Sequence, residues 1–112
     1  MQLYHYKIGF PKEVVLIYGI LNLKYSEHAK RESREDRYGA ITLPDSLNTA
    51  AVKLIEAEVD GGVMVKGVYR AALNDLNDLV LVVMRDGFVR TVWKNRKNDQ
   101  HRTLDRARYC RP

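Results

Sequence analysis

The sequence predicts an α+β domain, in which an antiparallel sheet of about four strands has an N-terminal helix packed on one face. Two observations carry this prediction. The charged segment from residue 26 to residue 36 is rich in helix formers. The chain from residue 51 to residue 95 is instead a series of apolar, β-branched segments separated by turn residues. With 112 residues, of which 46% are hydrophobic, residues 1–112 are expected to form a single domain with one core.

The first part of the chain is expected to form one or two strands, over residues 2 to 8 and 14 to 24, with Pro11 and Gly19 as interruptions. Its apolar run from residue 14 to residue 23 is far shorter than the ~20 residues of a membrane-spanning helix. The first ten residues include tyrosines, a histidine and a lysine where a secretory signal needs a continuous apolar core. No membrane partner is therefore expected.

The predicted helix begins with Ser26 as a favourable N-cap and Glu27 in its first turn. Ala29 is the only small apolar residue inside it, so the helix lacks a broad apolar face. We expect it to dock through Tyr25, Ala29 and the ring of His28. Its charged side chains are then left near solvent or near a ligand.

Strands are predicted through the second half of the chain. Residues 51 to 59 are ambiguous between helix and strand by propensity, but the glycine pair 61–62 and the β-rich segment 63 to 73 favour a hairpin. The segment from 78 to 85 is nearly all apolar, which is typical of a central strand covered on both faces. The dipeptide at 86–87, Asp-Gly, is the strongest hairpin signal of the chain.

The strand that follows this turn, residues 88 to 95, brings a threonine and a tryptophan together. Alternation places Val89, Thr91 and Trp93 on one face of the strand. The other face then presents Arg90, Val92 and Lys94. The polar remainder, residues 97 to 109, is expected to form a turn followed by a short helix or an extended edge segment.

Positive charge is concentrated in the C-terminal quarter of the chain. From residue 85 onward, nine Lys or Arg stand against three Asp, a net charge of +6, whereas residues 1 to 84 carry a net charge of −1. A polyanion-binding face and a solvated basic surface explain this pattern equally well. The single cysteine, Cys110, has no partner for an intrachain disulfide, which favours a reducing compartment and predicts a cytoplasmic protein.

Two histidines, His28 and His101, lie in the most polar segments of the chain, and each is followed by basic residues. Cleaving RNA without a metal ion requires a base for the ribose 2′-OH, an acid for the leaving oxygen, and cations or donors for the phosphorane charge. Histidine can serve as acid or base near neutral pH. The alternatives are a structural histidine satisfied by a backbone carbonyl at position 28 and a plain surface residue of a basic tail at position 101.

Hydroxyl, aromatic and cationic side chains accompany the histidines, and each has a functional and a structural interpretation. Thr91, Thr103 and Tyr109 are candidates for orienting a phosphate or assisting proton transfer, beside ordinary roles in strand formation and packing. Trp93 either packs in the core or stacks on an unpaired base. The candidate phosphate-binding residues are Lys30, Arg31, Arg70 and Arg102.

A metal site is the competing interpretation of the C-terminal segment. Asp99, His101 and Asp105 have side chains that can bind a divalent ion. Five arginines between residues 96 and 111 would surround that ion with like charge, and no second histidine or cysteine lies at ligand spacing. We therefore expect no metal and no cofactor.

Two stretches together resemble a known family: YSEHAKRESREDRYG, residues 25 to 39, and RTVWKNRKNDQHRTLDRARY, residues 90 to 109. From about residue 20 to its end, the chain is similar to the small RNase toxin domains of the barnase/EndoU/colicin/RelE (BECR) group. The likeness is greatest to C-terminal toxin domains of contact-dependent inhibition systems and to related phage-encoded small proteins. Its specific part is a T-x-W-x-N strand followed by D-x-H-x-T-L-D-x-x-x-Y, with an upstream H-A at a helix start.

This resemblance implies a BECR-like fold and metal-independent cleavage of RNA, often tRNA, that leaves a 2′,3′-cyclic phosphate. The residues that match the family pattern are His28, Thr91, Trp93, His101, Thr103 and Tyr109. A chain that begins with Met is expected to be a phage or plasmid protein acting inside the producing cell. Such a cell would need a neutralising partner, most simply an acidic antitoxin or immunity protein.

The leading hypothesis from the sequence is a small cytoplasmic endoribonuclease whose partner is RNA. The alternative from a different functional class is a non-catalytic module of the same fold that binds RNA or an acidic host protein. A metal-dependent nuclease that uses Asp99, His101 and Asp105 is the third hypothesis. Fragments ending in cyclic phosphate, sought with and without EDTA, distinguish the three.

Overall fold

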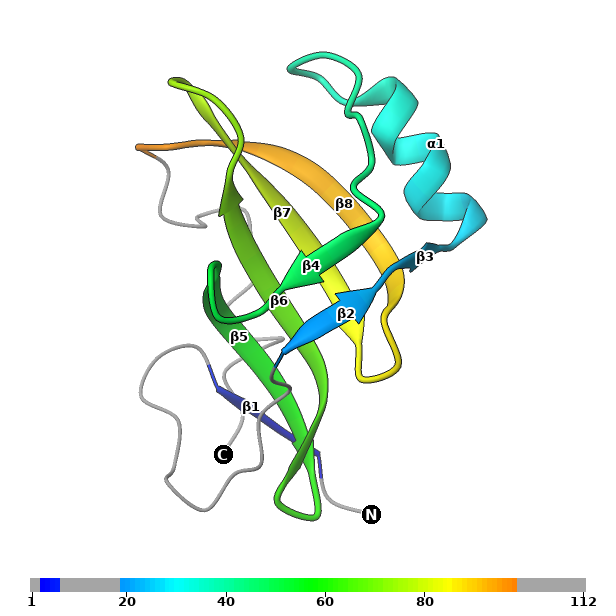
Figure 1. The fold of residues 1–112 in the computed structure, drawn as a ribbon, viewed down its shortest axis with the longest axis vertical. Coiled ribbons are helices and arrows are strands. Elements are labelled where there is room, and N and C mark those ends of the chain that lie inside the picture. Colours follow the sequence, from blue (N-terminus) through cyan, green and yellow to red (C-terminus); the bar gives the residue numbers. More distant parts are fainter. Residues whose placement is uncertain (1–2, 7–18, 99–112) are drawn as a thin grey trace.

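The computed structural model describes residues 3–6 and 19–98, and in these ranges the chain is mostly sheet (Figure 1). The helix in this part of the chain is α1 (Glu27–Glu35). The strands are β1 (Leu3–Tyr6), β2 (Ile20–Asn22), β3 (Lys24–Tyr25), β4 (Ser46–Asn48), β5 (Lys53–Asp60), β6 (Val63–Ala72), β7 (Asn77–Met84) and β8 (Phe88–Arg96). No helix in the described ranges is long and apolar enough to cross a membrane.

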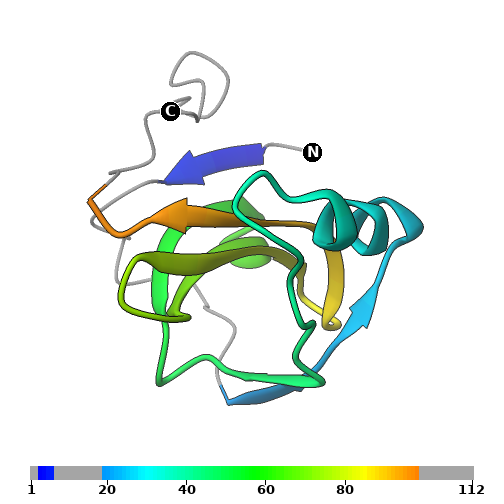
Figure 2. The same cartoon turned by 90° about the horizontal axis from the view of Figure 1, so that it is seen from above.

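The main sheet has six strands in the order β1-β5-β6-β7-β8-β3, and β2 and β4 form a separate two-stranded sheet. Neighbours from β5 to β8 are antiparallel, whereas β3 runs parallel to β8, with Tyr25 opposite Val89. The main sheet is therefore mixed. Seen from above, the β2–β4 pair lies across from the main sheet, and the chain between α1 and β4 closes the side between them (Figure 2).

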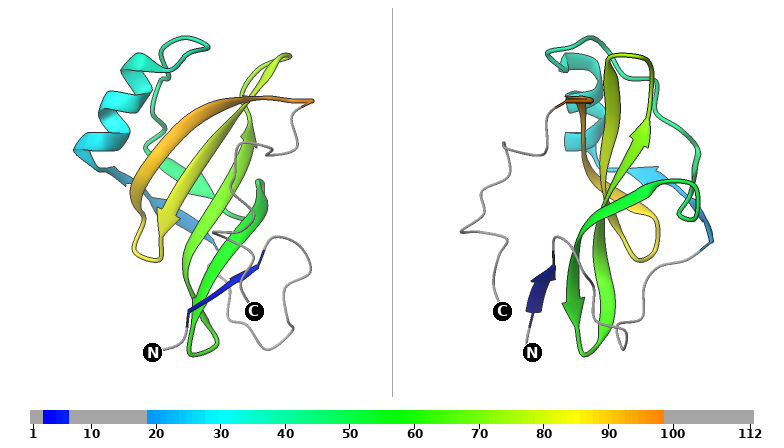
Figure 3. Two further views of the ribbon diagram at one scale, coloured as in Figure 1. Left: turned by 180° about the vertical axis from the view of Figure 1, so that it is seen from behind. Right: turned by 90° about the vertical axis from the view of Figure 1, so that its left-hand side faces the viewer.

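The predicted four-stranded antiparallel sheet with an N-terminal helix on one face, the BECR-like arrangement, is wrong. A six-stranded mixed sheet and a second small sheet replace it, and α1 lies along the edge of β8 (Figure 3). The strands β2, β3 and β4 span two or three residues each, too few to carry a period-2 pattern. Their extended state depends on tertiary pairing, as in the 2.9 Å hydrogen bond from the Leu23 N–H to the Asp45 carbonyl.

The predicted start of the helix is confirmed. Ser26 accepts a hydrogen bond of 2.9 Å from the backbone N–H of Ala29, and Ala29 is fully buried. Tyr25 packs against the core, as expected. His28 does not, because its side chain is 65% exposed, so the prediction that its ring docks the helix is wrong. The second buried position of the helix belongs to Ser33.

The two predicted hairpins are confirmed. The glycine pair 61–62 joins β5 to β6, and Asp86 and Gly87 join β7 to β8. Gly87 is required for two reasons: its φ is 93°, and a Cβ on it would lie 2.2 Å from the carbonyl oxygen of Asn22. This close approach lets the Lys24 N–H donate to the Gly87 carbonyl at 3.1 Å, which is how β3 joins the sheet.

Buried side chains lie on both faces of the main sheet. The larger cluster contains Ala29, Ile41, Leu47, Ala57, Val59, Met64, Tyr69, Leu79, Leu81, Val83, Val89 and Val92. The smaller cluster contains Ile55, Val68 and Val80, with Val82 and Trp93 partly buried against it. Because β7 contributes to both clusters, the prediction of a central strand covered on both faces is confirmed.

The alternation of faces along β8 breaks at one residue. A register shift against β7 leaves Arg90 as an extra residue of β8. Val89 therefore lies in the same core cluster as Val92, and the prediction that it shares a face with Thr91 and Trp93 is wrong. Trp93 packs in the smaller cluster, and Thr91, two residues earlier, shares its face.

Candidate functional site

Hydrogen bonds, rather than a broad apolar contact, hold α1 along the free edge of β8. The backbone N–H of Val92 donates to Glu32 Oε1 at 3.3 Å, and that of Lys94 donates to Asp36 Oδ1 at 3.0 Å. The hydroxyl of the N-cap residue also donates to a backbone carbonyl of β8 at 2.9 Å. These bonds satisfy backbone groups that an uncovered edge strand would offer to another chain.

Glu32 also connects two of the predicted site residues. Its Oε1 accepts a hydrogen bond from Thr91 Oγ1 and lies 3.3 Å from Nε2 of His28, one turn earlier on α1. The side chain of His28 is 65% exposed and that of Glu32 is 31% exposed, so the imidazole is accessible to solvent beside a partly buried glutamate. Glu32 is not among the site residues that the sequence predicts. The signal that could have found it is the i, i+4 spacing of a histidine and a glutamate on one helix face.

The imidazole of His28 lies beside this carboxylate on an exposed part of α1. Nε2 of the His28 ring lies 3.3 Å from Oε1 of Glu32, so the protonated ring and the carboxylate form a close pair of opposite charges. The hydrogen bond from Thr91 helps to hold the carboxylate in place, and the exposed imidazole of His28 beside it is accessible to a ligand.

The two elements that meet at Glu32 also carry an aromatic side chain, Trp93 of β8, and two cations, Lys30 and Arg31 of α1. Trp93 is half-buried in the smaller core cluster, so packing accounts for part of its ring. Lys30 and Arg31 are exposed on α1, and Lys30 Nζ lies 3.4 Å from Glu27 Oε1. An exposed ion pair of this kind is weak, so it does not prevent Lys30 from binding an anion.

Arg70 is on β6, and its guanidinium makes hydrogen bonds within the main sheet. Its Nε donates to Asp78 Oδ2 at 2.5 Å and its Nη2 donates to the Arg96 carbonyl at 2.7 Å. Burial alone would raise the pKa of the Asp78 carboxyl, but hydrogen bonds and charges from Lys97 and Arg70 hold that pKa below its usual value. The guanidinium of Arg70 is thus held at the Arg96 end of β8, whereas the residues that meet Glu32 are His28, Thr91 and Val92.

Several predicted residues of the C-terminal segment lie outside the described residues. They are His101, Arg102, Thr103 and Tyr109, together with Asp99 and Asp105 of the metal interpretation. Within residues 3–6 and 19–98, no group of three or more His, Cys, Asp or Glu side chains is placed to hold a metal ion.

Comparisons with protein-family models, with curated proteins and with solved structures find no match to this chain. The likeness to small RNase toxin domains therefore stays a prediction from the sequence. The contacts of Glu32 with His28 and Thr91 are accordingly the basis for a functional assignment.

Proposed function

We propose that this chain is a metal-independent endoribonuclease that binds RNA along the edge formed by α1 and β8. One observation carries the proposal: the solvent-facing imidazole of His28 shares a carboxylate with the hydroxyl of Thr91. An exposed histidine oriented by a carboxylate is suited to activating a ribose 2′-OH. The basic C-terminal quarter of the chain supports a polyanionic substrate.

In the proposed reaction, a ring nitrogen of His28 takes the proton of the ribose 2′-OH while the 2′-oxygen attacks the adjacent phosphorus. The bond between phosphorus and the 5′-oxygen breaks, and that oxygen takes a proton from a general acid. The products are a 2′,3′-cyclic phosphate and a 5′-hydroxyl. Glu32 stabilises the imidazolium. On the family resemblance, His101 is the candidate acid, with Thr103 and Tyr109 beside it.

The remaining predicted groups bind the substrate in this proposal. Lys30, Arg31 and Arg102 hold phosphates, and Trp93 stacks on an unpaired base through the exposed part of its ring. On the family resemblance, the RNA substrate is tRNA. The enzyme acts in the cytoplasm, where an acidic antitoxin or immunity protein neutralises it.

A cleavage assay on total RNA in the presence of EDTA tests the proposal. The wild-type chain is expected to give discrete fragments ending in cyclic phosphate, and His28→Ala is expected to cleave at least about 100-fold more slowly. Because the His28 side chain is exposed, the thermal midpoint of this variant should stay close to that of the wild type. Arg34→Ala, an exposed position in the last turn of α1, is the matched control and should cleave normally.

Three results would contradict the proposal, each in a different way. Cleavage by His28→Ala at the wild-type rate would remove the histidine from the reaction. Cleavage that EDTA abolishes would indicate a metal-dependent nuclease. RNA binding by the wild-type chain without any fragments would indicate a binding module.

A further inference from the structure

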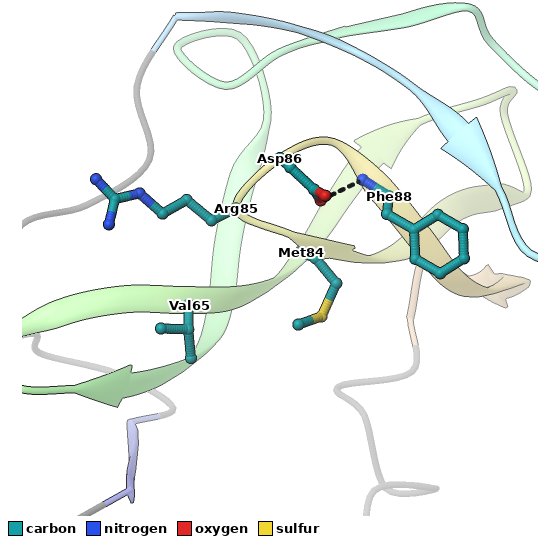
Figure 4. A pocket seen from close by; sticks show the side chains of 5 residues that line it. All are labelled: Val65, Met84, Arg85, Asp86 and Phe88. Atoms are coloured by element: carbon teal, nitrogen blue, oxygen red, sulfur yellow. Dashed lines mark hydrogen bonds between the residues drawn. The ribbon is translucent and has the colours of Figure 1, made fainter. Parts of the chain in front are cut away.

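An open pocket of about 650 Å³ lies at the hairpin between β7 and β8 (Figure 4). We call it the hairpin pocket, and its lining residues are Val65, Met84, Arg85, Asp86 and Phe88. The surface of the pocket is mainly apolar. The side chain of Phe88 is 40% exposed, although a residue of this type is usually buried. A large exposed aromatic side chain beside a hollow is a candidate contact for a ligand.

The lining of the hairpin pocket suits a planar ring. The ring of Phe88 and the thioether of Met84 extend to the same side of the hairpin (Figure 4). Asp86 Oδ1 accepts a hydrogen bond of 3.1 Å from the Phe88 N–H, so this carboxylate is turned back onto the turn. An aromatic face next to a polarisable sulfur favours stacking against a flat, apolar ligand group.

Three cations belong to the same end of the sheet as Phe88, although the Arg85 side chain extends away from the Phe88 ring (Figure 4). Lys24 is the register partner of Phe88 across the β3–β8 pair, and Arg90 follows Phe88 by two residues. Both are exposed, as is Arg85 in the pocket lining. Asp86 is the one carboxylate among the five lining residues. An exposed aromatic ring on a strand with Lys24 opposite it and Arg90 beyond it matches a nucleotide, which offers a base for stacking and a phosphate for pairing.

The hairpin pocket lies at the start of β8, and the proposed catalytic site lies further along the same strand, at Thr91. Met84 is two residues from Val82, and Val82 is the register partner of Thr91. The pocket and Thr91 are therefore on the same face of the sheet. Phe88 and Thr91 are three residues apart, about 10 Å along an extended strand. Nearby nucleotides of one RNA strand can therefore reach both positions.

We propose that the hairpin pocket binds an unpaired base of single-stranded RNA, close to the phosphodiester at the edge formed by α1 and β8. This inference rests on the proposed function for the position of the cleaved bond. The base stacks on Phe88, and Arg85 and Lys24 hold the flanking phosphates. A base inside a duplex cannot present its face to Phe88, so the pocket selects unpaired RNA.

The test measures binding of a short, fluorescein-labelled 2′-O-methyl RNA strand, which cannot be cleaved by 2′-OH attack, to the full chain. Phe88→Ala is expected to weaken binding about five- to tenfold, near the lower end of base–aromatic stacking because the ring is partly exposed. Phe88→Trp should restore the affinity. Leu76→Ala, which removes a 65% exposed apolar side chain from the turn between β6 and β7, is the matched control and should bind normally.

Unchanged binding by Phe88→Ala would overturn the inference. An equal loss of RNA affinity in Leu76→Ala would also overturn it. An RNA affinity that depends on Arg85 and Lys24 but not on Phe88 would have the same consequence. If Phe88→Ala weakened the binding of a fully base-paired RNA duplex by the same factor, the selection of unpaired bases would also be contradicted.

The cleavage assay separates this inference from the proposed function. Cleavage by the wild-type chain together with normal binding by Phe88→Ala would reject the pocket alone. Weakened binding by Phe88→Ala without any cleavage by the wild-type chain would reject the endoribonuclease alone and leave the pocket as an RNA-binding site.

Discussion

Glu32 binds the backbone N–H of Val92 through the same carboxylate oxygen that faces His28. This oxygen both closes part of the open edge of β8 and orients the imidazole. Stability and the proposed reaction therefore depend on one atom. Because an edge N–H needs only an acceptor whereas an imidazolium needs a negative charge, conservative and non-conservative variants of Glu32 separate the two roles.

Glu32→Gln keeps an oxygen that can accept from Val92 but removes the charge beside His28. We expect a loss of stability of about 0.5–1 kcal/mol, because the hydrogen bonds lose only their charge assistance. RNA cleavage is expected to fall about tenfold, because the imidazolium loses its counter-charge. Glu32→Ala should cost about 1–3 kcal/mol, because it leaves the Val92 N–H without this acceptor.

Urea unfolding and the cleavage assay measure the two effects, with Glu35→Gln, an exposed carboxylate on the same helix, as the control. Equal stability of Glu32→Gln and Glu32→Ala would contradict the role of this side chain at the β8 edge.

Asp36 closes the next N–H along the same edge, that of Lys94, and its second oxygen accepts from the Tyr38 N–H at 3.0 Å. Asp36→Ala is expected to lower the free energy of unfolding by about 1–2 kcal/mol. It should also increase self-association, because the edge strand regains an unpaired donor. Urea unfolding and sedimentation measure these effects. Asp36→Asn keeps an acceptor and should associate no more than the wild type; if both variants associate equally, the carboxylate does not protect the edge.

Gly87→Ala is expected to destabilise the chain more than Gly19→Ala, although both glycines have similar φ values of 93° and 95°. A Cβ at Gly19 meets nothing within 4 Å, so that variant carries only the left-handed backbone penalty of about 1 kcal/mol. At Gly87 the Cβ would also meet the Asn22 carbonyl oxygen at 2.2 Å, which we expect to raise the total to about 3 kcal/mol or more. Thermal unfolding of both variants measures the difference, and equal midpoints would contradict it.

The parts of the fold that the sequence predicts correctly depend on interactions over a few residues. The helix start at Ser26 follows from capping, and the hairpins at Gly61 and Gly87 follow from positive φ. The order of the main sheet does not follow, because β3 joins β8 through a contact of Gly87 with a segment distant in the sequence. The extra residue Arg90 leaves no mark in the alternating pattern, so the face of Val89 was also predicted wrongly.

Like the fold, the candidate site was predicted from the sequence only in part. The chemistry of histidine and threonine selected His28 and Thr91, and the structure brings them to one carboxylate. Glu32 was missed because its role depends on how α1 lies against β8, which helix propensity does not determine. Arg70 was chosen as a cation, but its donors are used within the sheet by Asp78 and a backbone carbonyl, a pairing that needs the register of β6 and β7.

Asp78 gives the fold a pH dependence. Its carboxylate lies 2.5 Å from Arg70 Nε and 2.6 Å from Lys97 Nζ. Burial alone would raise its pKa, but hydrogen bonds and charges from Lys97 and Arg70 hold it below the usual value of 3.8. A carboxyl with a lowered pKa stabilises the folded state above the pKa of the unfolded state, because the unfolded chain binds the proton more tightly. This contribution should be complete above about pH 5 and decrease as the pH falls below about 4.

Asp78→Asn removes the titration while keeping an acceptor for Arg70. Near neutral pH the variant is expected to be about 1–2 kcal/mol less stable than the wild type, because the largely buried Arg70 and, to a smaller extent, the exposed Lys97 lose their counter-charge. The difference should shrink between about pH 5 and pH 2, since protonation of the wild-type carboxyl removes the same charge. Urea unfolding across this range measures it, with Asp75→Asn, an exposed residue of the turn between β6 and β7, as the control. A difference that stays constant down to pH 2 would contradict the coupling between the charge of Asp78 and the sheet.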